Sequence, residues 1–399
     1  MIDLVKIVLS FILIVSLLRF RWNLGWVMLA ASVFLGALYS IGPMDQLAVF
    51  AGSSVDPVTL NLVGGLVLIM VVENIIRKRG LLRQMTESLS AIARDRRVSM
   101  AVLPGIIGLL PSAGGAAFSA PLVQEAAGTS TVSPERRALI NYWFRHPWEY
   151  FSPLYPGVIL AAAITHIPVN RFMLSQSPLP LALVLVGAFL CFRGVEGHRV
   201  EGTRSRKDVL DLALALLPIA GAVVLVAFAG LGLSPAMTVI VIALFAVYRY
   251  SWKEMGTALK ESISLNIIVM VLGVMAYKGM LDASGAIDSL PRFFRESGMP
   301  PAAVFFALPF IVGLLTGVTV AFVGSTFPLV VAMTGGHPDP STVTFAFASG
   351  FAGIMLSPTH LCLLLTARYF KADLAGTYRL LYLPVLLVFL VGLAQYAMR

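Results

Sequence analysis

The fold is decided by two stretches, Leu110-Pro-Ser-Ala-Gly-Gly-Ala-Ala-Phe-Ser-Ala-Pro-Leu122 and Leu315-Thr-Gly-Val-Thr-Val-Ala-Phe-Val-Gly-Ser-Thr-Phe-Pro-Leu329. Each stretch interrupts an apolar segment, 98–124 or 301–333, with residues that break or loosen a helix. Backbone groups freed in this way have no partner in lipid, so they persist at membrane depth only inside protein or beside an aqueous cavity. The two stretches therefore predict re-entrant hairpins that mark a binding site.

The chain around these hairpins has the composition of a membrane protein. Its 399 residues are 58% hydrophobic and 12% charged, and the mean hydropathy is +0.88. A span needs about 20 apolar residues, and such runs recur along the whole sequence. The first run follows Met1-Ile-Asp, so we expect a retained helix rather than a signal peptide. The predicted fold is all-α, with ten spans at 3–20, 24–42, 59–76, 138–168, 178–193, 208–229, 234–250, 264–281, 342–367 and 381–398.

The two halves of the sequence repeat each other at an offset of 205 residues. The offset pairs Leu60-Asn61 with Leu265-Asn266, Leu103-Pro104 with Leu308-Pro309, and Ser152-Pro153 with Ser357-Pro358. A constant offset through Pro, Asn and Ser is typical of an internal duplication. The predicted domains are a first repeat at 1–195, a basic cytoplasmic linker at 196–207 and a second repeat at 208–399.

Each repeat contains five predicted spans and one hairpin, and the odd number places the second repeat upside down relative to the first. With the N-terminus outside, the cytoplasmic segments collect 22 of the 29 Lys and Arg residues, as the positive-inside rule requires. We therefore predict a multi-pass inner-membrane protein with both termini outside. The first hairpin then enters from the cytoplasm and the second from outside.

The hairpins supply the first set of candidate binding residues, because half-helix N-termini attract anions, unwound carbonyls can hold a cation such as Na⁺, and hydroxyls donate and accept. These candidates are Ser112, Gly114, Gly115 and Ser119 in the first hairpin and Thr316, Thr319, Ser325 and Thr326 in the second. The alternative is that small residues serve only close helix packing.

The second set lies in two repeat-equivalent segments that each contain a Ser-Pro pair. Ionisable residues inside a span are functional candidates by default. Arg145 could neutralise an anionic solute, and His146 or Glu149 could carry a coupling proton; an Arg145–Glu149 ion pair that braces the helix is the alternative. The full set is Arg145, His146, Glu149 and Ser152 in the first repeat and Ser357, Thr359 and His360 in the second.

Other classes of function find little support in the sequence. The net charge of +9 sits in loops between spans, so we expect no nucleic acid partner. The two cysteines, Cys191 and Cys362, form no CxxC pair, and His146-Pro-Trp-Glu149 is no HExxH helix, so we expect no catalytic residue, no cofactor, and no metal beyond a possible coupling Na⁺.

With hairpins and Ser-Pro breaks placed, the whole chain resembles the ion transporter superfamily of gluconate, citrate, dicarboxylate and arsenite transporters, and most closely an uncharacterised prokaryotic integral-membrane family within it. The dicarboxylate branch carries Ser-Asn-Thr at each hairpin tip, whereas the tips here read Pro111-Ser112-Ala113-Gly114 and Gly324-Ser325-Thr326. The resemblance implies an elevator mechanism, a homodimer, and movement of 59–76, 138–168, 264–281 and 342–367 together with the hairpins.

The resulting hypothesis is a secondary active transporter of a small, anionic solute, coupled to H⁺ or Na⁺, with membrane lipid around it. A passive channel built on the same inverted repeats stays open as an alternative. An intramembrane enzyme is the third hypothesis, although no nucleophile-elbow motif accompanies the serines and histidines.

Overall fold

The structure is a computed structural model that describes residues 2–20, 22–93, 95–111, 115–128, 132–197, 205–285 and 300–398. All secondary-structure elements that form within these ranges are helices, and none is a strand. Five helical runs are long and apolar enough to cross a membrane: Pro57–Lys78, Val169–Leu190, Arg206–Ala227, Leu265–Ala283 and Leu374–Ala397. The chain is an all-α membrane protein.

The first half of the chain forms a series of helices of very different lengths. They are α1 (Ile2–Arg19), α2 (Leu24–Leu38), α3 (Pro43–Val55), α4 (Pro57–Lys78), α5 (Leu81–Ile92), α6 (Arg96–Ile107), α7 (Gly115–Ala127), α8 (Pro134–Arg145), the 3-10 helix η1 (Pro147–Tyr150), α9 (Pro156–Thr165), α10 (Val169–Gln176) and α11 (Pro178–Leu190).

The second half follows the same order of long, short and paired helices. They are α12 (Arg206–Ala227), α13 (Leu233–Val247), α14 (Trp252–Ser262), α15 (Leu265–Ala283), α17 (Pro301–Thr316), α18 (Thr319–Met333), α19 (Pro340–Met355), α20 (Leu361–Phe370) and α21 (Leu374–Ala397). Several starts recur at the offset found in the sequence: α9 and α20 are both 10 residues long and begin 205 residues apart.

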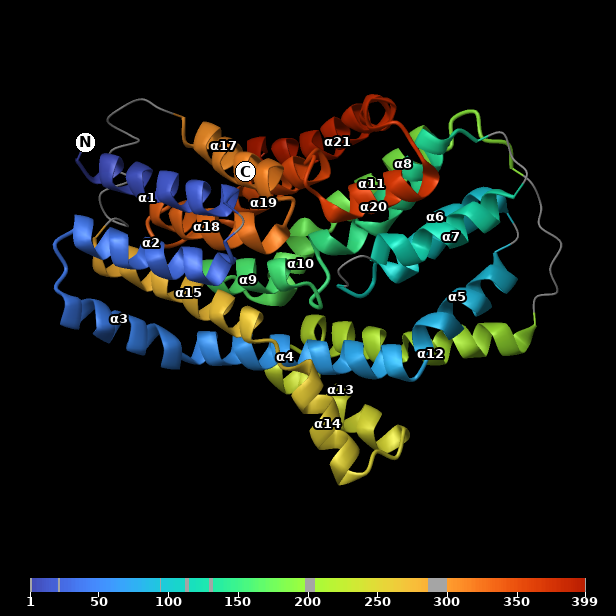
Figure 1. Ribbon diagram of the computed structural model, residues 1–399, viewed down its shortest axis with the longest axis horizontal. Coiled ribbons are helices and arrows are strands. Elements are labelled where there is room, and N and C mark those ends of the chain that lie inside the picture. The colour runs from blue at the N-terminus through green and yellow to red at the C-terminus, as the bar shows by residue number, and fades with distance from the viewer. Residues whose placement is uncertain are drawn as a thin grey trace.

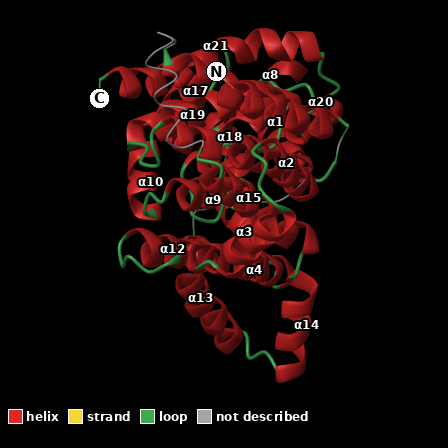
Figure 2. Cartoon of the chain, turned by 90° about the vertical axis from the view of Figure 1, so that its left-hand side faces the viewer, coloured by secondary structure: helices red, strands yellow, loops and turns green. Residues whose placement is uncertain are grey.

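Packing divides the helices into two groups. The hairpin group comprises α6 to α11 and α17 to α21, within which α17 packs on α19, α18 on α9, and α20 on α7 and α8. The frame group comprises α1 to α5 and α12 to α15, within which α2 packs on α15, α4 on α13, and α5 on α12. In Figures 1 and 2, α17, α19 and α21 lie at the upper edge, and α3, α4 and α12 lie in the lower part, directly above α13 and α14.

The two predicted hairpins are helical pairs, α6 with α7 and α17 with α18. Figure 1 shows them at opposite ends of the long axis, with α6 and α7 on the right and α17 and α18 on the left. Both pairs contain an internal proline near the middle, Pro104 and Pro121 in the first and Pro309 and Pro328 in the second.

The predicted spans 138–168 and 342–367 are each two shorter helices. The first breaks between α8 and α9, around Pro147 and Pro153, and the second between α19 and α20, at Pro358. A proline lacks the N–H that would continue the helical ladder and clashes with the preceding turn, so the prolines account for both interruptions. The sequence predicts ten spans, but only five of the described helical runs are long and apolar enough to cross a membrane.

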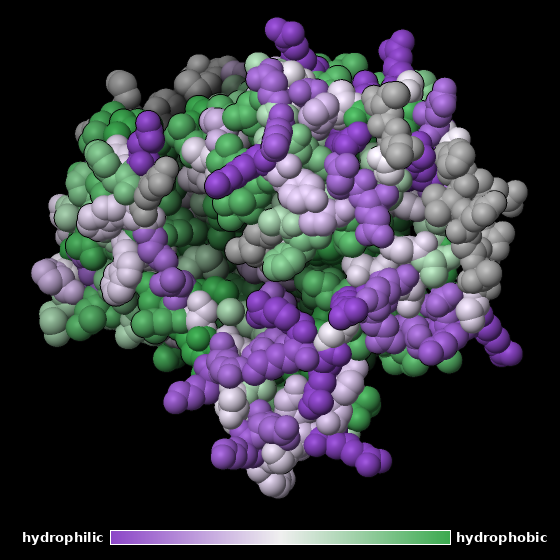
Figure 3. Space-filling model, turned by 45° about the vertical axis from the view of Figure 1, so that its right-hand side comes forward, coloured by the Kyte–Doolittle hydropathy of each residue, from purple (hydrophilic) through white to green (hydrophobic). Residues whose placement is uncertain are grey.

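Three helices occupy places where the sequence predicts loops. Helix α5 lies between the predicted span 59–76 and the predicted hairpin segment 98–124, while α3 and α14 follow the predicted spans 24–42 and 234–250. Helix α14 projects with α13 from the lower side in Figures 1 and 2, and hydrophilic side chains cover this projection in Figure 3. Of the predicted linker, residues 198–204 lie outside the described residues.

A polar contact at the end of α4 joins the two halves of the chain within the frame group. Lys78 at the end of α4 forms an ion pair with Glu261 of α14, and Asn74 donates to the Ser262 hydroxyl at 3.2 Å. The hydrogen bond from Lys78 lowers the pKa of the exposed Glu261 carboxyl. Such an exposed pair adds little stability, so the apolar contacts of α4 with α13 and α15 hold the frame group together.

Candidate functional site

The site lies where the two helix breaks meet the turn of the second hairpin. Helix α8 ends at Arg145 and η1 follows it, α20 begins just after His360, and Gly317 and Val318 connect α17 to α18. These segments are far apart in sequence and belong to both halves of the chain. Their breaks expose backbone carbonyls and free helix ends in the interior, where side chains must complete the hydrogen bonding.

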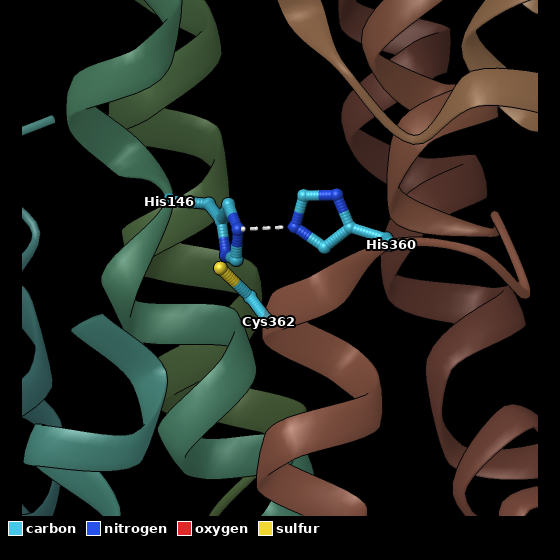
Figure 4. Close-up of side chains that lie close together, drawn as sticks. All are labelled: His146, His360 and Cys362. Carbon is cyan, nitrogen blue, oxygen red and sulfur yellow. Dashed lines mark hydrogen bonds between the residues drawn. The ribbon is translucent and has the colours of Figure 1, made fainter. Parts of the chain in front are cut away.

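Two histidines face each other across the breaks. Nε2 of His146 lies 3.2 Å from Nε2 of His360, and the two rings are 0% and 7% exposed. Figure 4 shows the rings pointing toward each other, with the Cys362 side chain rising from α20 toward the His146 ring. One ligand atom from each of His146, His360 and Cys362 lies within 4.8 Å of the other two.

The backbone holds both imidazole rings by their other nitrogen. Nδ1 of His146 is 2.5 Å from the carbonyl oxygen of Tyr142, and Nδ1 of His360 is 2.7 Å from that of Gly317. A carbonyl oxygen can only accept, so each Nδ1 carries the hydrogen. The edge of the Tyr142 ring also contacts both imidazoles, with centroid separations of 4.6 and 5.5 Å.

Glu149 brings a carboxylate to the same place from η1. Its Oε2 accepts a hydrogen bond of 3.1 Å from the Thr319 hydroxyl, at the first residue of α18. Its Oε1 lies 3.7 Å from Nε2 of His146, and Glu149 is 9% exposed. This carboxylate therefore connects the break of the first half to the hairpin of the second half.

Gly317 is required at the turn of the second hairpin for two reasons. Its φ of +65° lies in the left-handed region that favours glycine. A Cβ there would lie 2.8 Å from the Cα of His360, so the turn and the α20 start approach closely only with glycine. The same turn presents the carbonyl that orients His360.

The first hairpin is fixed to its break by aromatic side chains. Trp148 donates from Nε1 to the Gly105 carbonyl at 2.7 Å, and Tyr155 donates its hydroxyl to the Gly108 carbonyl. A Cβ on Gly108 would lie 2.1 Å from the carbonyl oxygen of Arg145, so α6 and α8 touch backbone to backbone. Arg145 itself is 2% exposed, which makes it a buried positive charge beside the site.

Most candidates from the hairpins bond to their own helix. The hydroxyls of Ser119, Thr316, Ser325 and Thr326 each donate to a carbonyl three or four residues earlier. Thr319 is the exception, since it reaches Glu149. Gly115 is buried at the start of α7, while Ser112 and Gly114 lie outside the described residues.

The Ser-Pro candidates form local turns within the breaks. The Ser152 hydroxyl accepts from the backbone N–H of Leu154 at 3.3 Å. The Ser357 hydroxyl is 2.9 Å from that of Thr359, which also donates to the Leu315 carbonyl at 3.2 Å. Ser357 and Thr359 thereby join the second break to the second hairpin, and the Ser357 carbonyl accepts from the backbone N–H of His360 at 3.3 Å.

Three further residues at the site, Cys362, Tyr142 and Asn141, are not among the residues predicted from the sequence. Asn141 donates to the Thr366 hydroxyl at 2.9 Å and to the Ala116 carbonyl at 3.2 Å, which joins α8 to α20 and α7. The one signal that could have pointed to Cys362 is its position two residues after His360, at the start of the same half-helix.

A family model described as "Protein of unknown function (DUF401)" matches residues 4–398. No curated protein matches the chain.

Proposed function

The chain belongs to the DUF401 family, and we propose that it is a secondary active transporter that moves a small, anionic solute across the inner membrane by an elevator-like mechanism. The proposed coupling ion is H⁺, with Na⁺ as the other candidate. The observation that carries the proposal is the buried Glu149, bonded to Thr319 of the opposing hairpin and close to His146.

An intramembrane carboxylate is expensive to bury and is typical of ion and proton pathways. Glu149 connects η1 to α18, and the relative position of these two elements would change as the hairpin moves. A change in the charge of Glu149 therefore alters the contact between them. The buried Arg145 and the N-terminus of α18 favour an anion near the same place. These features support coupling between a proton and an anionic solute.

Pairs of helix contacts support the inverted repeat. In the repeat, α2 corresponds to α13 and α15 corresponds to α4. The contact of α2 with α15 therefore has its equivalent in the contact of α13 with α4. In the same way, α18 on α9 exchanges with α7 on α20. If each broken or consecutive pair (α8 with α9, α10 with α11, α19 with α20) crosses once, each repeat crosses five times.

The two groups supply the two bodies of an elevator. Contacts between them are limited to a few helix pairs, chiefly α18 with α15, α9 with α4, and α5 with α6. A cavity of about 230 Å³ lies between the groups and is lined by Asn61 of the frame group and His166 of the hairpin group, among others. The resemblance implies that 59–76 and 264–281 move with the hairpins, but α4 and α15 pack mainly on α13 and α2, so we assign them to the frame.

The first experiment measures thermal stability of the purified protein across pH and Na⁺ concentration with a panel of small carboxylates and oxyanions. A ligand that binds only the folded state raises stability by RT ln(1 + [L]/Kd). We expect a solute-specific rise that depends on pH. If the rise in stability requires Na⁺ and does not depend on pH, Na⁺ rather than H⁺ is the coupling ion.

The second experiment places the protein in proteoliposomes with the solute that the screen identifies. An imposed pH gradient should drive accumulation of that solute above its external concentration. Equilibration without accumulation would identify a passive channel and overturn the transporter proposal.

A further inference from the structure

The facing nitrogens of His146 and His360 are both acceptors. Each Nδ1 carries its hydrogen because it points at a backbone carbonyl, so each neutral ring presents a lone pair at Nε2. Two lone pairs at 3.2 Å repel each other unless a cation lies between them. A shared proton or a metal ion can fill this role.

Cys362 distinguishes the two cations. A proton between two imidazoles needs no third ligand, whereas a zinc-class ion takes imidazole nitrogen and thiolate sulfur together. The ligand atoms of His146, His360 and Cys362 gather within 4.8 Å. Two nitrogens on one tetrahedral Zn²⁺ lie about 3.3 Å apart, given Zn–N distances of about 2.0–2.1 Å. The observed 3.2 Å matches this separation.

We propose that His146, His360 and Cys362 form a binding site for one zinc-class divalent metal ion at the meeting point of the two helix breaks. Three protein ligands leave a fourth position open. Glu149 Oε1, 3.7 Å from Nε2 of His146, is the neighbouring oxygen that can approach it.

The surroundings have the features of a metal site. The Nδ1 hydrogens bonded to the carbonyls of Tyr142 and Gly317 orient both rings, as second-shell partners do around metal-bound histidines. The ligand set spans both halves of the chain, from the α8 end to the α20 start. Thiolate and carboxylate together supply two negative charges against the divalent ion and the buried Arg145.

The metal site goes beyond the proposed function, because binding needs only the folded protein and no transport. The test therefore uses the purified full chain. Apo protein is titrated with Co²⁺, which reports sulfur ligation by a charge-transfer band and tetrahedral geometry by its visible spectrum. Competition with Zn²⁺ then gives the affinity for zinc.

We expect one equivalent of Co²⁺ to bind with a sulfur charge-transfer band that Zn²⁺ displaces. Cys362→Ser should remove that band, and His360→Ala should weaken metal binding by about 100-fold or more, since even the loss of a second-shell partner costs about 10–100-fold. Cys191→Ser is the matched control, because this cysteine is also buried and is not one of the three ligands, and it should leave the band unchanged.

X-ray absorption of the wild-type protein with one equivalent of Zn²⁺ keeps the proposal testable if a variant fails to fold. One sulfur at about 2.3 Å and two imidazole nitrogens at about 2.0–2.1 Å are expected. A shell without sulfur, a charge-transfer band that survives Cys362→Ser, or no binding at one equivalent would overturn the site and leave a shared proton between the histidines.

Discussion

At the scale of single residues, Glu149 is the group whose neighbours best define its role. It lies in the 3-10 helix between two prolines, Pro147 and Pro153, accepts from Thr319 and approaches His146. Oε2 of Glu149 accepts from Thr319 and Oε1 lies 3.7 Å from Nε2 of His146, while the charge of Arg145 also acts on this carboxylate. We propose that Glu149 has the coupling role, and a structural brace is the alternative that the next variant tests.

Glu149→Gln tests this role directly. The amide keeps the shape and can still accept from Thr319, but it cannot take up a proton at physiological pH. We expect solute flux in proteoliposomes to lose its dependence on the pH gradient while the protein stays folded and inserted. Glu125→Gln, an exposed change on α7, is the control and should behave as wild type. A variant Glu149→Gln with an unaltered pH dependence would assign Glu149 to packing.

Thr319→Val tests whether the hydrogen bond from the second hairpin to the Glu149 carboxylate contributes to coupled uptake. A hydrogen bond to a charged group contributes about 1.5–3 kcal/mol, so its loss should slow coupled uptake by about tenfold or more. Thr319→Ser should restore most of the rate because it keeps the hydroxyl. Thr326→Val is the control, since the Thr326 hydroxyl bonds within its own helix. Equal losses in Thr319→Val and Thr326→Val would show a general packing defect instead.

The sequence was sufficient to predict His146, Glu149 and His360 as candidates, because an ionisable residue in an apolar span stands out. It could not predict that His146 and His360 touch, since 214 residues separate them and only tertiary packing joins them. Cys362 gave only one weak signal, its place two residues after His360, because a single cysteine in an apolar helix is usually a small core residue.

At the scale of helices, the prolines and glycines predicted both hairpins and both breaks. The short helices were harder to predict. Helix α5 buries Leu81, Met85 and Leu89, one per turn, and exposes Arg83 and Glu87 between them. A search for long apolar spans passes over such an amphipathic helix, whose periodicity and not its mean hydropathy carries the signal.

A close helix crossing in the frame group offers a test of packing. Helices α2 and α15 meet at Gly25 and Gly273, where a Cβ on Gly273 would lie 2.4 Å from the Gly25 carbonyl oxygen. Small residues allow such backbone contact in membranes. Gly273→Ala should therefore lower the free energy of unfolding by about 1–3 kcal/mol through overpacking.

Thermal unfolding in detergent measures this effect. The matched control is Gly256→Ala in α14, where an added Cβ would meet no atom within 4 Å. That change should be neutral or raise stability by about 0.5–1 kcal/mol, because alanine suits a helix interior better than glycine. If both variants behaved alike, the proposed crossing of α2 and α15 would be wrong.

At the scale of the whole molecule, the two hairpins pack differently on the frame group. Helix α18 contacts α2 and α15, and its residues from Ala321 to Met333 are all buried. Among the described residues, the counterpart α7 makes no comparable contact with α13 or α4. Ala117 and Phe118 are exposed on α7, whereas Gly324 and Ser325, which occupy the same places relative to the helix proline, are buried on α18.

Alternating access by an elevator predicts that this asymmetry reverses. In the second state α7 should pack on α4 as α18 packs on α15 now. A Cβ on Gly324 would lie 2.7 Å from Cγ2 of Val274, so these positions are close in the present state. The repeat places Ala117 and Ile69 in the equivalent positions.

Paired cysteines can trap each state in a Cys191→Ser background. Gly324→Cys with Val274→Cys should cross-link readily and stop uptake until reductant is added, because a disulfide forms only when the two Cα atoms come within about 7 Å. Ala117→Cys with Ile69→Cys should cross-link only in protein that has moved, so its yield should change with the solute or the pH gradient. Single-cysteine variants are the controls. If the 324–274 disulfide left uptake intact, or if the 117–69 pair never formed in actively transporting protein, the two groups would not exchange as the repeats predict, and a mechanism without an elevator movement would be required.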